Sequence, residues 1–264
     1  MVRQSALELL NRLVASGRET FTSAEVAEIL DLSQQSASNL LTRLVNQGLV
    51  DRVARGHYVI RPIGRLGTSA AAEETALAVA AVFSKRPHRI GYRSALAFHG
   101  LIVHPTRRIQ VACPDLVRVS ELSGRPLQVI QESRDFVDIG AVVAGHGALV
   151  SDIERALIDG ARRVELVGGL DVLAEALETA ASDLDMPVVK DYSAKLNEPA
   201  ALRRLSSVAR VLNLDQLADG LLEDVEAGFR PLRADPAVKN PTEWTDSAAR
   251  VVWSSTDLDT VRRS

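Results

Sequence analysis

The residues of this sequence that are best suited to chemistry share one face of a helix predicted over about residues 34–46. That face presents short amides and hydroxyls with one arginine: Gln34, Gln35, Ser36, Ser38, Asn39, Thr42 and Arg43. Amides and hydroxyls can hydrogen-bond to base edges in the major groove, and arginine can reach guanine or phosphate. A helix face that only meets solvent more often carries a mixture of glutamate and lysine. The face therefore predicts binding to double-stranded DNA.

A basic segment follows this helix and predicts a second region that touches DNA. Residues 49–54 and 57–60 read as two strands, with Arg55-Gly56 as the turn between them. The segment gathers four basic or titratable side chains: Arg52, Arg55, His57 and Arg61. Such a hairpin can act as a wing that touches phosphates and so positions the protein on the duplex.

Two earlier helices and a cap must position the polar face. Residues 5–15 have leucines at helical spacing, and Thr22 with Glu25 has the form of a capping box. Ser33 can cap the third helix by accepting a backbone N–H of its first turn, and it is also predicted to be among the DNA-binding residues at the start of that helix. The other face of that helix is an apolar stripe made of Ala37, Leu40, Leu41, Leu44 and Val45. The order of these elements predicts a winged helix-turn-helix over residues 1–62; the alternative is a unit of the same shape that contacts only protein.

Length and composition bound the rest of the chain. At roughly 100–200 residues per domain, 264 residues predict two domains. No run of 18 apolar residues and no apolar leader is present, so neither a membrane span nor a signal peptide is expected. The single cysteine, Cys113, allows no internal disulfide and favours the reducing cytoplasm. The net charge is −3, yet residues 1–66 carry eight arginines and six acids, which weakly supports the DNA interpretation.

The fold class predicted for the whole chain is α+β, a winged helix-turn-helix followed by a mixed α/β domain. Residues 63–69, with two glycines, are predicted to be a linker. A few strands and then several helices are predicted over residues 70–215. Residues 216–264 form an extension to which the sequence assigns no role.

The sequence contains few motifs that are typical of catalysis, so we expect neither an enzyme nor a bound cofactor. The sequence has no glycine-rich phosphate loop with a lysine and no G-x-S-x-G motif. The five histidines lack the spacing of a metal site, which needs three or four converging ligands. Cys113 precedes a proline at the end of a predicted strand and is expected to be a buried small residue rather than a nucleophile.

Two blocks of the predicted second domain resemble AbiEi-type antitoxins. Residues 91–101, GYRSALAFHGL, are similar to the "Y-x-S-x-x-A-L-x-x-H/W-G-L" block of that family. Residues 151–159, SDIERALID, followed by Gly168-Gly169, resemble its "P-E-R-x-L-x-D … G-G" block, although Asp152-Ile153 stands where a proline is common. With the winged helix in front, the resemblance covers about residues 1–215.

The resemblance implies an antitoxin of a type IV toxin–antitoxin system with a role in phage defence. Such a protein would bind inverted repeats in its own promoter and repress its operon. It would counter a nucleotidyltransferase-like toxin without forming a stable complex with it. The oligomeric state is left open, with a dimer on two half-sites of the DNA as one alternative.

The residues of the two blocks are predicted to be structural rather than catalytic. They are Tyr92, Ser94, Leu96, His99, Gly100, Arg155, Asp159, Gly168 and Gly169. Arg155 and Asp159 stand four positions apart on one helix face and can form an ion pair. Two other functions remain as alternatives: a ligand-responsive winged-helix regulator, and an enzyme or enzyme subunit fused to a winged helix.

Overall fold

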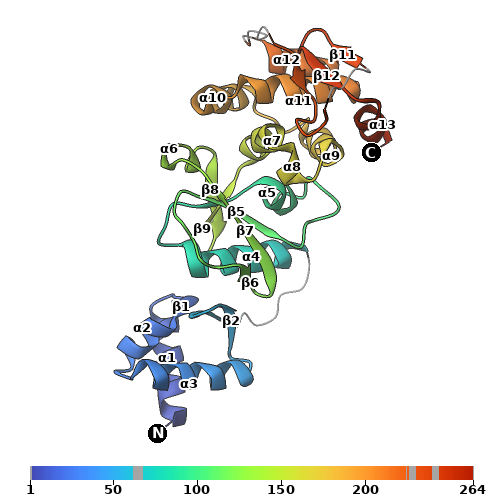
Figure 1. The fold of residues 1–264 in the computed structure, drawn as a ribbon. Coiled ribbons are helices and arrows are strands. Elements are labelled where there is room, and N and C mark those ends of the chain that lie inside the picture. The colour runs from blue at the N-terminus through green and yellow to red at the C-terminus, as the bar shows by residue number, and fades with distance from the viewer. Residues whose placement is uncertain (1, 62–67, 224, 226–229, 240–243, 264) are drawn as a thin grey trace. The chain divides into compact units, whose positions relative to one another are not determined.

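The computed structural model describes residues 2–61, 68–223, 225, 230–239 and 244–263 (Figure 1). The chain separates into two compact units. The first comprises Met1–His88, Arg107–Gln131 and Val143–Leu149, and the second comprises Arg89–Thr106, Glu132–Val142 and Val150–Ser264. The chain therefore passes between the units several times. The boundaries proposed at residues 62, 69 and 215 stay predictions, and residues 62–67 of the linker region lie outside the described residues.

The first unit begins with a winged helix. Its elements are α1 (Val2–Ala15), β1 (Thr20–Thr22), α2 (Ser23–Ile29), α3 (Gln34–Asn46), β2 (Val50–Ala54) and β3 (His57–Ile60). The three strands form a sheet in the order β1-β3-β2, antiparallel throughout. The sequence did not predict β1, because three residues are too few to show an alternating pattern. Phe21 of β1 stacks on Tyr58 of β3 with ring centroids 6.0 Å apart.

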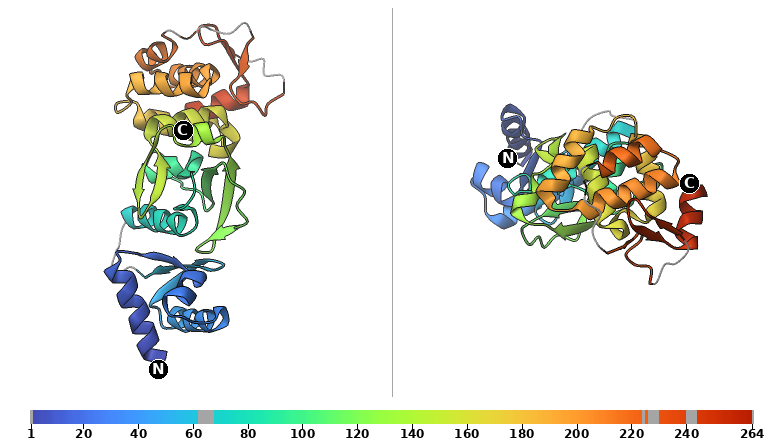
Figure 2. Two further views of the ribbon diagram at one scale, coloured as in Figure 1. Left: turned by 90° about the vertical axis from the view of Figure 1, so that its left-hand side faces the viewer. Right: turned by 90° about the horizontal axis from the view of Figure 1, so that it is seen from above.

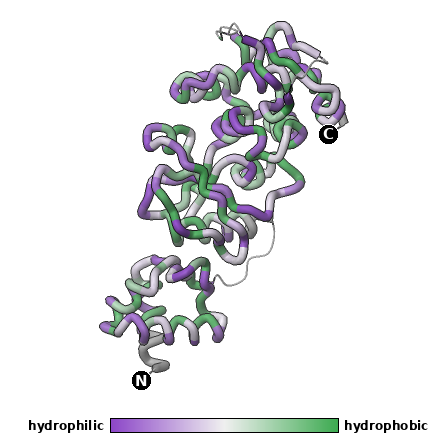
Figure 3. The backbone as a smooth tube through the Cα atoms, in the orientation of Figure 1, coloured by the Kyte–Doolittle hydropathy of each residue, from purple (hydrophilic) through white to green (hydrophobic). Residues whose placement is uncertain are grey.

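The core of the winged helix explains why α3 turns its polar face outward. The tube in Figure 3 alternates between hydrophobic and hydrophilic residues along α3. The apolar residues Ala37, Leu40, Leu41 and Leu44 are buried together with Leu9, Phe21 and Val26. Fully burying a leucine side chain is worth about 1.5–3 kcal/mol, so this stripe fixes the rotation of the helix about its axis. The amides and hydroxyls between the buried positions are left at the surface.

The remaining elements of the first unit are helical or extended segments that follow the winged helix along the chain. They include α4 (Thr68–Phe83), β5 (Ile109–Cys113), β6 (Glu121–Leu122) and β7 (Arg125–Gln131). β5 and β7 run parallel, with Ile109 opposite Leu127 and Cys113 opposite Gln131. Every residue of β5 is buried, which is typical of a strand in a parallel pair that is covered on both faces. Cys113 is buried at its end.

The second unit is mostly helical (Figure 2). Its elements are β4 (Arg89–Ile90), α5 (Tyr92–Phe98), α6 (Arg134–Val137), β8 (Ala141–Gly145), β9 (Ala148–Ser151), α7 (Ile153–Arg162), α8 (Val164–Val167), α9 (Leu170–Ala180), α10 (Met186–Leu196), α11 (Pro199–Val211), α12 (Asp215–Leu222), β10 (Leu232–Arg233), β11 (Trp244–Asp246), β12 (Val251–Trp253) and α13 (Ser255–Arg263). Strands β8 and β9 also contain residues of the first unit. Helix α7 packs against α5, α8, α9, α10 and α11. Seven consecutive residues of α7 are buried, and the charged Arg155 and Asp159 are among them.

The described residues near the C-terminus pack against α11 and form hydrogen bonds with it. Strand β12 lies between β10, which is parallel to it, and β11, which is antiparallel. Trp253 of β12 is fully buried and donates its Nε1–H to Ser207 Oγ at 2.9 Å. Arg203 is also buried and donates Nε–H to the carbonyl oxygen of Ala249 at 2.8 Å. The described part of the extension therefore packs as part of the second unit.

These observations confirm the predicted fold class, α+β with an N-terminal winged helix. Within the described ranges, no helix combines the length and the apolar character needed to cross a bilayer.

The capping box at the start of α2 yields a prediction about pH. Burial alone would raise the pKa of Glu25, but hydrogen bonds from the Thr22 N–H, from Lys85 and Arg18 and from the Thr22 hydroxyl outweigh it and lower the pKa to about 2. Because the folded pKa lies below the ordinary value of 4.5, this stabilisation is complete above pH 4.5 and is lost as the pH falls toward 2. The variant Glu25→Gln should therefore melt at a lower temperature than the wild type at pH 7, and the difference should shrink below pH 4.5.

Circular dichroism at a series of pH values measures both melting temperatures. Glu28→Gln, at an exposed position of the same helix outside the capping box, is the matched control and should leave the melting temperature nearly unchanged. A Glu25→Gln difference that stays constant from about pH 7 to about pH 3 would contradict the assignment.

Candidate nucleic-acid interface and buried ionic network

The N-terminus of α3 is built by a serine cap. Ser33 Oγ accepts the backbone N–H of Ser36 at 3.2 Å, and the two hydroxyls lie 2.9 Å apart. The cap satisfies one of the N–H groups that the first helical turn leaves unpaired. The serine side chains at 33 and 36 are thereby committed to the cap, which limits what they can offer to a ligand.

The amides on the exposed face of α3 are held by hydrogen bonds. Gln34 donates Nε2–H to Ser23 Oγ of α2 at 3.2 Å, which links the two helices of the helix-turn-helix. Gln35 donates Nε2–H to Asn39 Oδ1 at 3.1 Å, one turn further along. Gln34, Gln35, Ser38 and Asn39 are all exposed. The N-terminal half of the helix thus presents an ordered row of uncharged polar groups.

Arg43 is exposed and is the basic residue of the last turn of α3. Its Nε–H is donated to the Asn39 carbonyl oxygen at 3.2 Å, so the side chain lies back along the helix. The rest of the guanidinium keeps donors with which to meet a phosphate.

The wing presents only part of its predicted basic cluster. Arg52 and Arg55 are exposed, and Gly56 has a positive φ of +79°, a conformation that favours glycine at this turn. His57 is half-buried, and its Nδ1 lies 2.7 Å from the carbonyl oxygen of Ala81. Arg61 binds Asp51 with Nε–Oδ2 and Nη2–Oδ1 distances of 3.0 and 2.5 Å. The structure therefore leaves Arg52 and Arg55 as the wing residues best placed to meet a phosphate.

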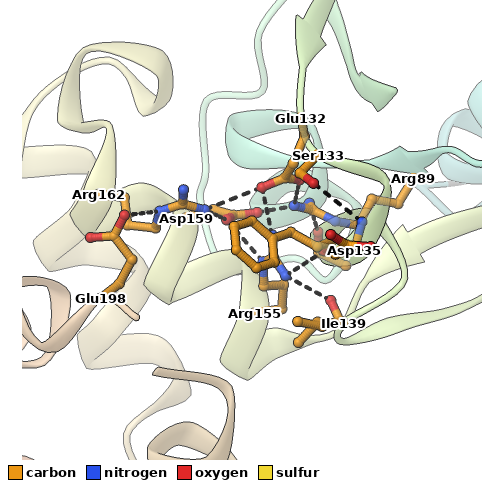
Figure 4. A network of polar contacts seen from close by, with 11 residues as sticks. Arg89, Glu132, Ser133, Asp135, Ile139, Arg155, Asp159, Arg162 and Glu198 are labelled. Atoms are coloured by element: carbon orange, nitrogen blue, oxygen red, sulfur yellow. Dashed lines mark hydrogen bonds and ion pairs between the residues drawn. The ribbon is translucent and has the colours of Figure 1, made fainter. Parts of the chain in front are cut away.

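The second unit contains a network of buried charges centred on α7 (Figure 4). Arg155 donates Nε–H to Asp159 Oδ1 at 2.9 Å and Nη2–H to Glu132 Oε1 at 2.8 Å. Arg89 of β4 donates Nη1–H to Asp159 Oδ2 at 2.7 Å and pairs with Glu132. Arg162 Nη1 reaches the same two carboxylates, at 3.2 Å from Glu132 and 3.3 Å from Asp159.

The charges of this network balance when one further acid is counted. Arg162 donates Nε–H to Glu198 Oε1 at 3.0 Å, which gives three arginines against three carboxylates. Arg89, Arg155 and Asp159 have no exposed side-chain surface. Burial lowers the pKa of Arg155, whereas at Arg89 burial is outweighed by the charges of Asp159 and Glu132, which raise the pKa. All three guanidinium groups remain protonated at neutral pH. The network therefore joins three segments electrostatically: β4, α7 and the short segment with Glu132 that precedes α6.

The first block of the resemblance packs beside this network. Tyr92 is buried with a positive φ of +53°, and burial, followed by the charges of Asp159 and Glu132, raises the pKa of its hydroxyl. Ser94 and Leu96 are buried in α5. His99 Nε2 lies 2.6 Å from the Ser151 carbonyl oxygen, and Gly100, with φ +70°, follows the end of the helix. A tyrosine with a raised pKa stays protonated and is unsuited to act as a base at neutral pH.

The paired glycines of the second block have a steric explanation. Gly168 and Gly169 have φ angles of +105° and +130°. A Cβ on Gly168 would collide with Arg93 Nη1, whose hydrogen is donated to the Val167 carbonyl oxygen at 2.9 Å. Gly168 therefore lets Arg93 approach the end of α8, while a Cβ on Gly169 would lie 2.5 Å from Asp171 Oδ1. Among the described residues, no three His, Cys, Asp and Glu side chains are grouped so that they could hold a metal ion.

Sequence reasoning missed Arg89, Glu132 and Arg162 as partners of Arg155 and Asp159. The i, i+4 spacing on one helix shows a local pair, but Glu132 and Arg89 come from segments 23 and 66 positions before Arg155. A signal that could have raised suspicion was the density of apolar residues around Arg155 and Asp159, since buried charges require partners.

The geometry of the first 60 residues defines a class, the winged-helix domain of DNA-binding transcription regulators. Comparison with known proteins agrees: residues 3–57 match the MarR family. Over 98% of its length, the chain is similar in fold to a crystal structure of the RV2827C protein from Mycobacterium tuberculosis, of which it covers 94%, with a TM-score of 0.66 and 15% identity. No curated protein matches the sequence.

The buried network predicts a large loss of stability when one charge is removed. Asp159→Ala removes one of the two carboxylates that the buried Arg89 and Arg155 share and leaves them with Glu132 alone, and breaking a buried pair in this way costs about 3–5 kcal/mol. Asp191→Ala is the matched control, because Asp191 and Lys195 form an exposed i, i+4 pair that contributes about 0.3–0.5 kcal/mol.

Urea denaturation followed by circular dichroism measures both variants against the wild type. Equal losses in the two variants would show that the Asp159 network is not stabilising through burial.

Proposed function

We propose that this protein is a DNA-binding antitoxin of a type IV toxin–antitoxin system that represses its own operon and has no enzymatic activity. Its winged helix binds inverted repeats in the promoter. The protein counters a nucleotidyltransferase-like toxin without a stable complex, and it requires no cofactor. In the bacterial cytoplasm such a system serves phage defence.

The observation that carries the DNA-binding part is the exposed face of α3. Its apolar side is locked in the core of the winged helix, and its other side offers Gln34, Gln35, Ser38 and Asn39 behind a formed N-cap. Arg43 at the end of the helix and Arg52 and Arg55 on the wing add cations at exposed positions. A recognition helix in the major groove with basic residues over the backbone uses these groups in this way.

Support for the antitoxin part comes from the two sequence blocks. Both resemble blocks of AbiEi-type antitoxins; the first forms α5, which packs on α7, and the second forms most of α7 with Arg155 and Asp159 of the buried network. Because the charges of the network satisfy one another, these blocks serve to build the second unit. An antitoxin that needs no active site is consistent with such a structure.

A gel-shift titration against the protein's own upstream promoter, at two salt concentrations and with unrelated DNA as control, tests the repressor function. Binding should prefer the promoter and weaken steeply with salt, because each neutralised phosphate releases counterions. Arg43→Ala and Arg55→Ala should each weaken binding and reduce the slope of log K against log salt by about one unit for each phosphate that the variant no longer neutralises.

Arg163→Ala is the matched control, since Arg163 is exposed, lies in the second unit and pairs with Glu165. It should leave both affinity and slope unchanged. Unchanged slopes in both Arg43→Ala and Arg55→Ala would place the DNA surface elsewhere, and no promoter binding at low salt would remove the proposal.

A growth assay tests the antitoxin function separately. Co-expression of the protein with the nucleotidyltransferase-like toxin of its operon should restore growth, while affinity purification of either should not retain the other. Continued growth arrest would contradict the antitoxin assignment, and a stable complex would contradict the type IV assignment.

A further inference from the structure

The amide pair on α3 limits which bases the helix can read. The N-terminal residues of a recognition helix are those that contact base edges. On α3 these residues are polar and uncharged, and the basic residue of the helix, Arg43, lies in its last turn. The side chain of Gln34 is hydrogen-bonded to Ser23, and the hydroxyl of Ser36 is hydrogen-bonded to that of Ser33. Gln35 and Asn39 are thus the large side chains at the base-reading end that face outward as a pair.

The hydrogen bond between Gln35 and Asn39 sets what the pair offers. One Nε2–H of Gln35 is donated to Asn39 Oδ1, which leaves the Gln35 Oε1 acceptor, the second Gln35 Nε2–H and the two Asn39 Nδ2–H groups for a ligand. If both amides were rotated by about 180°, the pair would still keep one amide oxygen and one amide NH2 free of the bond. Each amide also carries its own oxygen acceptor beside its own NH2 donor, and this pattern does not depend on how the amide atoms are assigned.

This pattern matches one base edge in the major groove. Adenine presents the N6 amino donor beside the N7 acceptor, whereas guanine presents two acceptors, O6 and N7, and is met by arginine or lysine. Either amide alone can also bind adenine N6 and N7 in a bidentate way. The oxygen and NH2 of one amide fit this donor and acceptor of adenine together, whereas the guanine edge offers no donor to the amide oxygen.

We propose that Gln35 and Asn39 read an adenine through its N6 and N7 atoms, so that each operator half-site contains an A·T pair that the protein requires. This inference rests on the proposed DNA-binding function. Arg43, which lies along the helix beyond Asn39, contacts phosphate and adds affinity without discrimination. Gln34 acts as a positioning residue, since its bond to Ser23 holds α3 against α2.

Promoter duplexes that lack single base atoms test the proposal with the full-length protein. In 7-deazaadenine the N7 acceptor is replaced by C–H, and in 7-deazaguanine the same change is made to guanine. We expect 7-deazaadenine at one position of each half-site to weaken binding about 10-fold, as the removal of one bidentate interaction with a base should do, while 7-deazaguanine has no effect.

The variants Gln35→Ala and Asn39→Ala show whether these residues bind that base. Each should weaken binding to the natural promoter about 10-fold and should weaken it no further on the 7-deazaadenine duplex, because the interaction is already absent there. Gln47→Ala, an exposed amide at the C-cap of the same helix, is the matched control and should behave as wild type. All three positions are exposed, so circular dichroism should show an unchanged fold.

Three results would overturn the inference. They are weaker binding with 7-deazaguanine instead of 7-deazaadenine, additive effects of variant and modified base, or wild-type affinity in both amide variants. Absence of binding to the natural promoter is a different result, because it removes the proposed DNA-binding function itself.

Discussion

A charge can be buried in a protein only when it is paired, and this constraint organises the second unit. Helix α7 packs against α5, α9 and α11, yet it carries Arg155 and Asp159 among its buried residues. Their burial requires Glu132 and Arg89 from other segments, since an isolated ion would cost several kcal/mol to desolvate. The helix can therefore occupy its place among the other helices only when β4 and the segment before α6 are also folded. Residues 151–159 form most of α7 and residues 91–101 form α5 beside it, so packing and charge pairing account for the side chains of both segments.

The winged helix follows a different constraint, because its core is apolar. Burying Leu40, Leu41 and Leu44 fixes the rotation of α3 and leaves its amides outside. The capping serine and the Gln34–Ser23 bond then fix the start of the helix and its position against α2. These interactions define which atoms are offered to a partner before any partner binds. A preorganised polar face of this kind lowers the entropy cost of recognition.

In the proposed antitoxin, the apolar core of the winged helix and the paired buried charges of the second unit have different consequences. The winged helix presents a surface whose polar groups are exposed, while the second unit satisfies its buried charges internally. The MarR-family match covers residues 3–57, so it bears on the first of these alone. The likeness to the RV2827C structure extends over 98% of the chain, so it bears on the fold of both units.

Local pattern in the sequence was enough to predict the helices and hairpin of the winged helix and the polar face of α3. These features depend on residues within a few positions of one another, such as Ser33 with Ser36 and Thr22 with Glu25. Tertiary structure alone decided the rest. It turned His57 toward a carbonyl oxygen, added β1 to the sheet and joined Arg155 to Glu132, because each of these interactions links segments that are distant in the chain and depends on packing.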